Sequence, residues 1–110
     1  RGLGRYEEAA RQFEAAIAKR PHWFLPYLHL GDLHLAAGRP YDATAVLREG
    51  VTLCGPHAAL HATFGRALLV TGQPDAALTQ GREAVRLAPD HPLALTYLGD
   101  ALAAHGQRAE

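Results

Sequence analysis

The feature that most constrains the fold of this chain is a pattern that returns every 34 residues. Leu30-Gly31 is matched by Phe64-Gly65 and then by Leu98-Gly99 at that interval. Gly38 is matched in the same way by Gly72. A fixed period of this length is typical of stacked-repeat proteins, in which each unit contacts only its neighbours. We therefore expect a continuous strip of repeats rather than a core that closes on itself.

Six stretches place apolar residues three and four positions apart, as one face of an α-helix requires. The first helix is expected from Arg5 to the residue before Pro21, because proline lacks the next backbone N–H. The others are expected at about 25–37, 41–53, 58–70, 75–87 and 92–104, separated by glycine and proline. Arg1 to Gly4 is interpreted as the end of a turn, Gly106 as a helix end, and residues 107–110 as the start of another helix. No strand is expected.

Glycine also recurs inside the predicted helices, at Gly31 and its two equivalents. A mid-helix glycine costs about 1 kcal/mol relative to alanine. Three occurrences of that cost need a reason, and close approach of neighbouring helices supplies one.

The charge of the chain is balanced, with 11 basic and 11 acidic residues, so no net field attracts nucleic acid or an anionic membrane. No apolar run approaches the roughly 20 residues that span a bilayer, so membrane insertion is not expected. Cys54 is the only cysteine, which excludes an internal disulfide and favours a reducing, cytoplasmic location. The abundance of alanine, arginine and glycine suggests a bacterial protein. Because the chain begins and ends part-way through a unit, we interpret it as a piece of a longer protein.

Two motifs carry a family resemblance. Tyr27-x2-Leu30-Gly31-x2-His34 recurs as Leu95-x2-Leu98-Gly99-x2-Leu102, and Ala9-x3-Phe13 is followed by Pro21. These motifs resemble the tetratricopeptide repeat, in which an aromatic residue, Leu-Gly and tyrosine precede alanine, an aromatic residue and proline. The resemblance implies an all-α fold, a right-handed solenoid of about six helices in antiparallel pairs.

The resemblance covers nearly the whole chain as one array. It implies the second helix of a partial repeat at 1–21, full repeats at 24–57 and 58–91, and the first helix of a partial repeat at 92–110. Five positions depart from the family's pattern: larger or different residues are usual at His34, Gly50, Gly55, His61 and Gly81. Losing a buried aromatic costs about 3–5 kcal/mol unless neighbours refill the hole. The central unit is therefore expected to pack differently or less tightly.

In the family, the first helices of successive units line a concave groove that takes an extended peptide or a helix. Carried over position by position, the groove residues are Leu25, Leu28, His29, Asp32, Ala59, Ala62, Thr63, Arg66, Leu69, Leu93, Thr96, Tyr97 and Asp100. Asp32, Arg66 and Asp100 are equivalent positions, so the sign of charge alternates along the groove. Because adjacent helices lie about 8–10 Å apart, Arg66 is expected either to join both carboxylates in an ion ladder or to offer its guanidinium to a ligand.

The chaperone-adaptor subgroup of the family holds a partner's terminal carboxylate with Lys, Asn and Arg side chains. Those places are occupied here by Leu28, Asp32, Thr63, Leu93 and Tyr97. No cation remains among them, so a receptor for chaperone tails is not expected. The groove is neutral and rather apolar, which favours a partner protein with an apolar helical or extended segment.

The sequence points to no catalytic residue, no metal and no cofactor. His57 and His61 are four residues apart, a usable ligand spacing, but no cysteine or carboxylate at a matching position completes a metal site. Cys54 has no predictable histidine partner, and the glycines are not clustered as phosphate-binding loops require.

The leading hypothesis is therefore a non-catalytic scaffold for protein–protein interaction. The alternative is the substrate-recognition arm of a larger enzyme, of the glycosyltransferase, sulfotransferase or hydroxylase type, as the resemblance also allows. A third hypothesis is self-association through end helices that lack polar caps.

Overall fold

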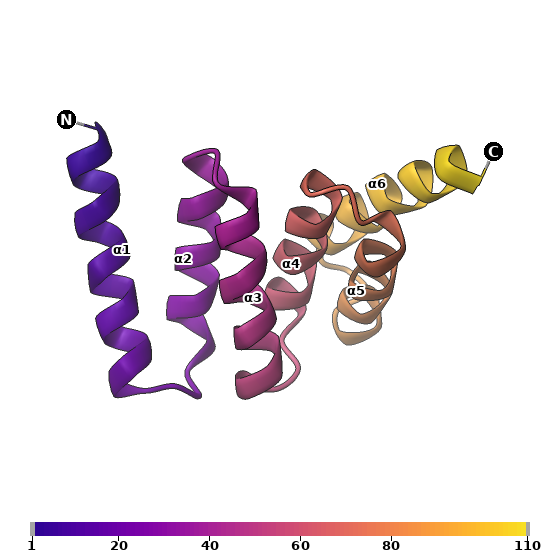
Figure 1. Cartoon of the computed structure of the whole chain (residues 1–110). Coiled ribbons are helices and arrows are strands. Elements are labelled where there is room, and N and C mark those ends of the chain that lie inside the picture. Colours follow the sequence, from indigo (N-terminus) through magenta and orange to yellow (C-terminus); the bar gives the residue numbers. More distant parts are fainter. Residues whose placement is uncertain (1, 110) are drawn as a thin grey trace.

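The computed structural model describes residues 2–109 of the chain, and the side chains of residues 4–106. Over that range it contains six helices and no strand (Figure 1). The helices are α1 (Gly2–Lys19), α2 (Phe24–Ala36), α3 (Pro40–Cys54), α4 (Ala58–Val70), α5 (Pro74–Leu87) and α6 (Pro92–Ala109). The all-α prediction is confirmed, and the predicted bounds of α2 to α5 agree with the observed ones to within one residue at each end.

Glycine and proline set the turns between these helices. Gly38 and Gly72 have φ angles of 75° and 80°, in the left-handed region that a residue with a Cβ rarely adopts. Each ends a helix, and Pro40 and Pro74 then begin the next one in its first turn, where the missing N–H costs nothing. The two turns predicted from these glycine and proline pairs are thereby confirmed.

Two predicted helix ends were wrong. α1 already includes Gly4, and α6 continues through Gly106 to Ala109. Gly38 and Gly72 are followed two residues later by proline, whereas Gly106 is followed by Gln107 and Arg108. Without proline, extending the helix gains one hydrogen bond for each residue added, which offsets the roughly 1 kcal/mol cost of glycine. Arg1 and Glu110 lie outside the described residues.

Each helix runs roughly antiparallel to the one before it, and the helices stack side by side (Figure 1). Helix α2 packs against both α3 and α4, and α4 packs against both α5 and α6. In contrast, α1 does not touch α3, and α3 does not touch α5, over the residues that the structure describes. The even-numbered helices therefore adjoin along the inner side of a curved stack of 42 × 28 × 21 Å, while the odd-numbered helices are spread along its outer side.

The core forms where large side chains enter the glycine positions of a facing helix. A Cβ at Gly31 of α2 would lie 2.6 Å from the side chain of Leu47 on α3. A Cβ at Gly50 of α3 would lie 2.8 Å from the Cβ of Tyr27 on α2. Leu47 and Tyr27 are both fully buried, so the two helices interlock reciprocally. We call these four residues the glycine interlock.

The same device explains why the unusual glycines leave no hole. A Cβ at Gly81 of α5 would lie 3.1 Å from the Cα of Leu98 on α6, so the backbones approach closely there as well. The packing at Gly50 and Gly81 thus differs from the family's pattern, as one of the two expected forms has it, and it is not looser, because Tyr27 and Leu98 occupy the space that a larger residue would fill.

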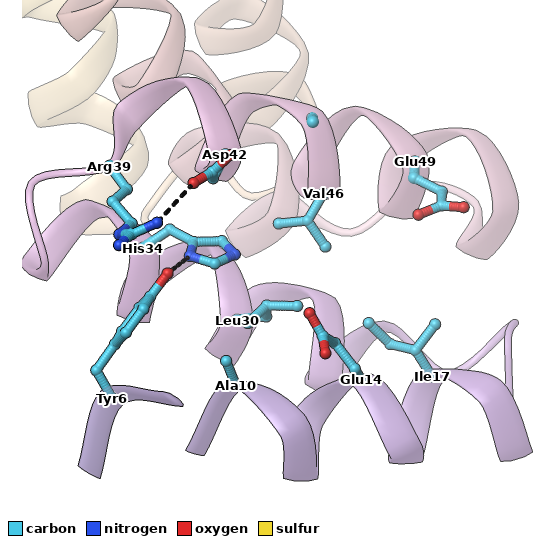
Figure 2. A pocket seen from close by; sticks show the side chains of 11 residues that line it. Tyr6, Ala10, Glu14, Ile17, Leu30, His34, Arg39, Asp42, Val46 and Glu49 are labelled. Atoms are coloured by element: carbon cyan, nitrogen blue, oxygen red, sulfur yellow. Dashed lines mark hydrogen bonds and ion pairs between the residues drawn. The ribbon is translucent and has the colours of Figure 1, made fainter. Parts of the chain in front are cut away.

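Histidines join α1 to α2. The hydroxyl of Tyr6 and Nδ1 of His34 are hydrogen-bonded at 2.8 Å, as Figure 2 shows. The rings of Phe13 and His29 stack with 5.5 Å between their centroids. Burial lowers the pKa of His34, an effect that Arg39 reinforces and that Asp42 and Glu14 oppose.

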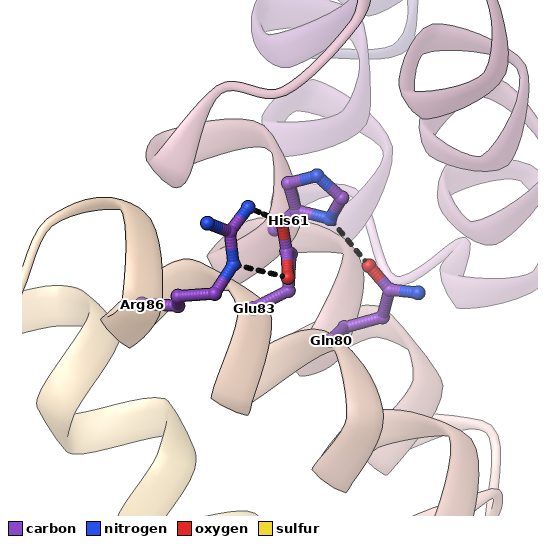
Figure 3. A network of polar contacts seen from close by, with 4 residues as sticks. All are labelled: His61, Gln80, Glu83 and Arg86. Atoms are coloured by element: carbon purple, nitrogen blue, oxygen red, sulfur yellow. Dashed lines mark hydrogen bonds and ion pairs between the residues drawn. The ribbon is translucent and has the colours of Figure 1, made fainter.

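A histidine also joins α4 to α5. Nδ1 of His61 donates a hydrogen bond of 2.6 Å to Oε1 of Gln80, beside an exposed pair formed by Glu83 and Arg86 (Figure 3). His61 is buried at a place where the family's pattern has an aromatic residue. The polar contact with Gln80 satisfies the imidazole there, as burial of a polar ring requires.

The glycine interlock predicts opposite effects for two substitutions at equivalent positions of the repeat. Gly31→Ala should lower the free energy of unfolding by about 1–3 kcal/mol, because the new Cβ overlaps Leu47. Gly99→Ala should raise it by up to about 1 kcal/mol, because nothing lies within 4 Å of that Cβ and alanine favours the helix. Urea denaturation followed by circular dichroism measures both. Equal effects of the two substitutions would contradict the interlock.

The lowered pKa of His34 predicts a loss of stability on acidification. The unfolded chain, with a histidine pKa near 6.5, binds the proton more readily than the folded chain. Above pH 6.5 His34 is neutral in both states and does not change the free energy of unfolding. As the pH falls from 6.5 toward the lower pKa of the folded state, the unfolded chain binds the proton first, and the free energy of unfolding decreases. His34→Gln keeps a hydrogen-bonding group opposite Tyr6, and it should reduce the acid sensitivity relative to the parent chain. Urea titrations of both chains at a series of pH values test this, and identical pH profiles would refute it.

Candidate functional site

The predicted groove residues lie on α2, α4 and α6, where α4 packs against both α2 and α6. The exposed members are His29, Asp32, Arg66, Leu93, Thr96 and Asp100. The half-buried members are Leu25, Leu28, Ala59, Leu69 and Tyr97. A partner on this side would therefore meet charged groups and the edges of leucine side chains together.

Two of the predicted groove residues are covered by helix packing. Ala62 is 1% exposed and packs with Ala84 of α5 and Ala94 of α6. Thr63 is 8% exposed. Both lie within the layer that holds the helices together, so the surface available to a partner is made by the other predicted residues.

The charged residues of the groove do not form a ladder. Neither Asp32 nor Asp100 forms an ion pair with Arg66 among the described residues. The guanidinium of Arg66 instead lies over the ring of Tyr97, 6.0 Å from its centroid. An exposed cation–π contact contributes about 0.5–1 kcal/mol and an exposed ion pair about as much, so neither strongly dominates. The ion-ladder hypothesis was wrong, and the exposed guanidinium retains donors for a ligand.

The carboxyl group of Asp32, one of the predicted groove residues, has a shifted pKa. Loss of water around the carboxyl raises its pKa above the ordinary 3.8, although His29 and Arg66 both act to lower the pKa. A titratable group that is shifted in a concave surface is a candidate for ligand binding. Asp32 and Arg66, both exposed on adjoining helices, thus offer an acceptor and a guanidinium that forms no ion pair with a described residue.

The groups considered for chemistry are engaged in packing. His57 stacks on Phe24 with 3.9 Å between the ring centroids, and His61 is bonded to Gln80. Burial raises the pKa of the Cys54 thiol, which disfavours the reactive thiolate. No group of three or more His, Cys, Asp or Glu side chains in the described part of the chain is placed to hold a metal ion.

Helix α6 also carries exposed apolar side chains. Leu95 and Leu102, seven residues apart and so on one face of the helix, are 49% and 45% exposed, while the preceding Ala94 and Ala101 are buried. This is the surface that the self-association hypothesis requires. None of the described helices is both long enough and apolar enough to cross a membrane.

Comparison with known proteins gives a family and a fold. The family model described as tetratricopeptide repeat matches residues 1–58 and 63–110. No curated protein sequence matches the chain. A crystal structure of MamA is 24% identical, with a TM-score of 0.82 over 96% of this chain and 62% of MamA.

Two further structures are similar. A thermophilic tetratricopeptide-repeat protein of Thermus thermophilus, TTC0263, is 24% identical, with a TM-score of 0.77 over 94% of this chain and 53% of that one. SycD, a type III secretion chaperone of Yersinia enterocolitica, is 21% identical, with a TM-score of 0.81 over 99% of this chain and 86% of SycD. The chain thus spans about three fifths or less of the length of MamA and TTC0263. The family match covers nearly all of the sequence and the helices stack as such repeats do, so the chain belongs to the tetratricopeptide-repeat family.

Proposed function

We propose that the chain is a non-catalytic interaction module whose concave side, formed by α2, α4 and α6, binds a peptide or helical segment of a partner protein. The observation that carries this proposal is the pair Asp32 and Arg66, both exposed on the adjoining helices α2 and α4 and neither in an ion pair among the described residues. Because neither side chain is in an ion pair with a described residue, a bound backbone can donate to the carboxylate and accept from the guanidinium. The similar protein SycD was crystallised in complex with a peptide of the translocator YopD, which supports this class of ligand.

The apolar part of the groove supplies the driving force in this proposal. Leu25 and Leu28 on α2 are half-buried, as is Leu69 on α4, so each keeps apolar surface that a ligand can cover. Burial of such surface contributes about 25 cal/mol per Å². An apolar segment with a polar backbone, helical or extended, matches this combination of leucine edges and central charges. We infer that the two full repeats at 24–57 and 58–91 build the groove together with the first helix of the partial repeat at 92–110.

A peptide selected from a random display library on the folded chain is the probe for this proposal. Arg66→Ala should weaken its binding by about 10-fold to 100-fold, because a hydrogen bond to a charged group contributes about 1.5–3 kcal/mol. Isothermal titration calorimetry measures the affinity. Arg82→Ala, which removes an exposed arginine from α5 outside the groove, is the control and should bind as the parent does.

Two results would count against the groove. One is an unchanged affinity in Arg66→Ala. The other is an equal loss in Arg82→Ala, which would indicate a general effect of net charge rather than a contact at this place.

A further inference from the structure

A hollow lies on the outer side of the stack, away from the groove. Helices α1 and α3 form its walls without touching each other over the described residues, and α2 forms its floor (Figure 2). Its volume is about 510 Å³, within the roughly 300–1,000 Å³ typical of ligand pockets. We call it the outer hollow.

Apolar side chains from three helices form a strip along the outer hollow. Ala10 and Ile17 of α1, Leu30 of α2 and Val46 of α3 line it. These side chains come from three helices and face a common space, as Figure 2 shows. A hydrocarbon stem placed along them would exchange water for apolar contact.

Two carboxylates face this apolar strip from opposite walls. Glu14 projects from α1 and Glu49 from α3 (Figure 2). Neither forms an ion pair with a described residue, whereas the nearby Asp42 pairs with Arg39 at 3.6 Å. The outer hollow therefore carries two negative charges that the described side chains do not neutralise, and the guanidinium that lines it is already paired.

A buried imidazole forms part of the same wall. His34 is 8% exposed, and its Nδ1 is bonded to Tyr6. Its Nε2 has no hydrogen-bond partner among the described residues, and the ring lines the outer hollow. In the tautomer in which Nδ1–H donates to Tyr6, Nε2 is an acceptor, which is the form that a nearby N–H donor favours.

We propose that the outer hollow binds a lysine side chain of a partner protein, with its methylene stem on the apolar strip and its ammonium group between Glu14 and Glu49. The ammonium group is the complement of two carboxylates on opposite walls, since it carries three donors and one positive charge. Arg39 lies at the other end, beside Asp42, so its charge directs the ammonium group toward the two glutamates. The site is separate from the groove, because it lies between α1 and α3 on the outer side.

Nα-acetyl-lysine methylamide is the probe for this site, titrated into the isotope-labelled chain and followed by NMR. Saturable shifts are expected at Glu14, Leu30, Val46 and Glu49, with the groove residues of α4 and α6 unaffected. The Nε-acetylated form of the probe, which keeps the stem and loses the charge, should bind at least about 10-fold more weakly.

Variants of the chain sharpen the test. Glu49→Gln should weaken binding of the lysine probe by about 5-fold to 10-fold while its urea denaturation curve stays that of the parent, because one of the two carboxylates that face the ammonium group is lost. Glu8→Gln makes the same change of net charge at an exposed residue of α1 outside the outer hollow, and it should bind the probe as the parent does.

Three outcomes would overturn the proposal. They are equal binding of the acetylated probe, an equal loss in Glu8→Gln and Glu49→Gln, and no saturable shift at the outer hollow. n-Pentylamine serves as a further probe, since it has the stem and the ammonium group without a peptide backbone. n-Pentylamine should bind about as tightly as the lysine derivative, because the proposal places only the stem and the ammonium group in the outer hollow, and failure of n-pentylamine to bind would contradict those contacts.

Discussion

Helices α2 and α3 approach each other closely because each lacks a side chain where the other presents a large one. Leu47 enters the space at Gly31, and Tyr27 enters the space at Gly50. Packed interiors tolerate little change of volume, so this arrangement fixes both the spacing and the register of the pair. Gly81 and Leu98 give α5 and α6 a similar approach. Because these contacts join helices that are neighbours in the chain, the stack needs no closed core, and its stability is expected to be a sum over neighbouring units.

Both candidate binding surfaces follow from how such pairs stack. The inner helices adjoin, so a partner there meets a nearly continuous surface of leucine edges and charged side chains. The outer helices α1 and α3 stand apart, so the same curvature opens the outer hollow between them. Glu14 and Glu49 are ordinary polar residues of the outer helices. They line one common hollow only because α1 and α3 are spaced apart.

The sequence was sufficient for those features that repeat. The interval between Leu-Gly motifs predicted the stacked fold, and Gly-x-Pro predicted two of the turns because it combines a positive φ with a proline start. Features that depend on the distance between helices could not be predicted from the sequence. Arg66 was expected to reach a carboxylate, but its side chain rests on Tyr97, and nothing in the spacing distinguishes two contacts of similar strength. Glu14 and Glu49 line the outer hollow from different helices. The sequence around either residue contains no pattern that predicts this.

The most direct test of the glycine interlock is a measurement of nuclear Overhauser effects in the folded chain. Cross-peaks are expected between the Leu47 methyl protons and the α-protons of Gly31, and between the Tyr27 ring or β-protons and the α-protons of Gly50. Both sets should be strong, because the atoms of each pair are in contact across two helices. A folded, helical chain that showed neither set of cross-peaks would contradict the account.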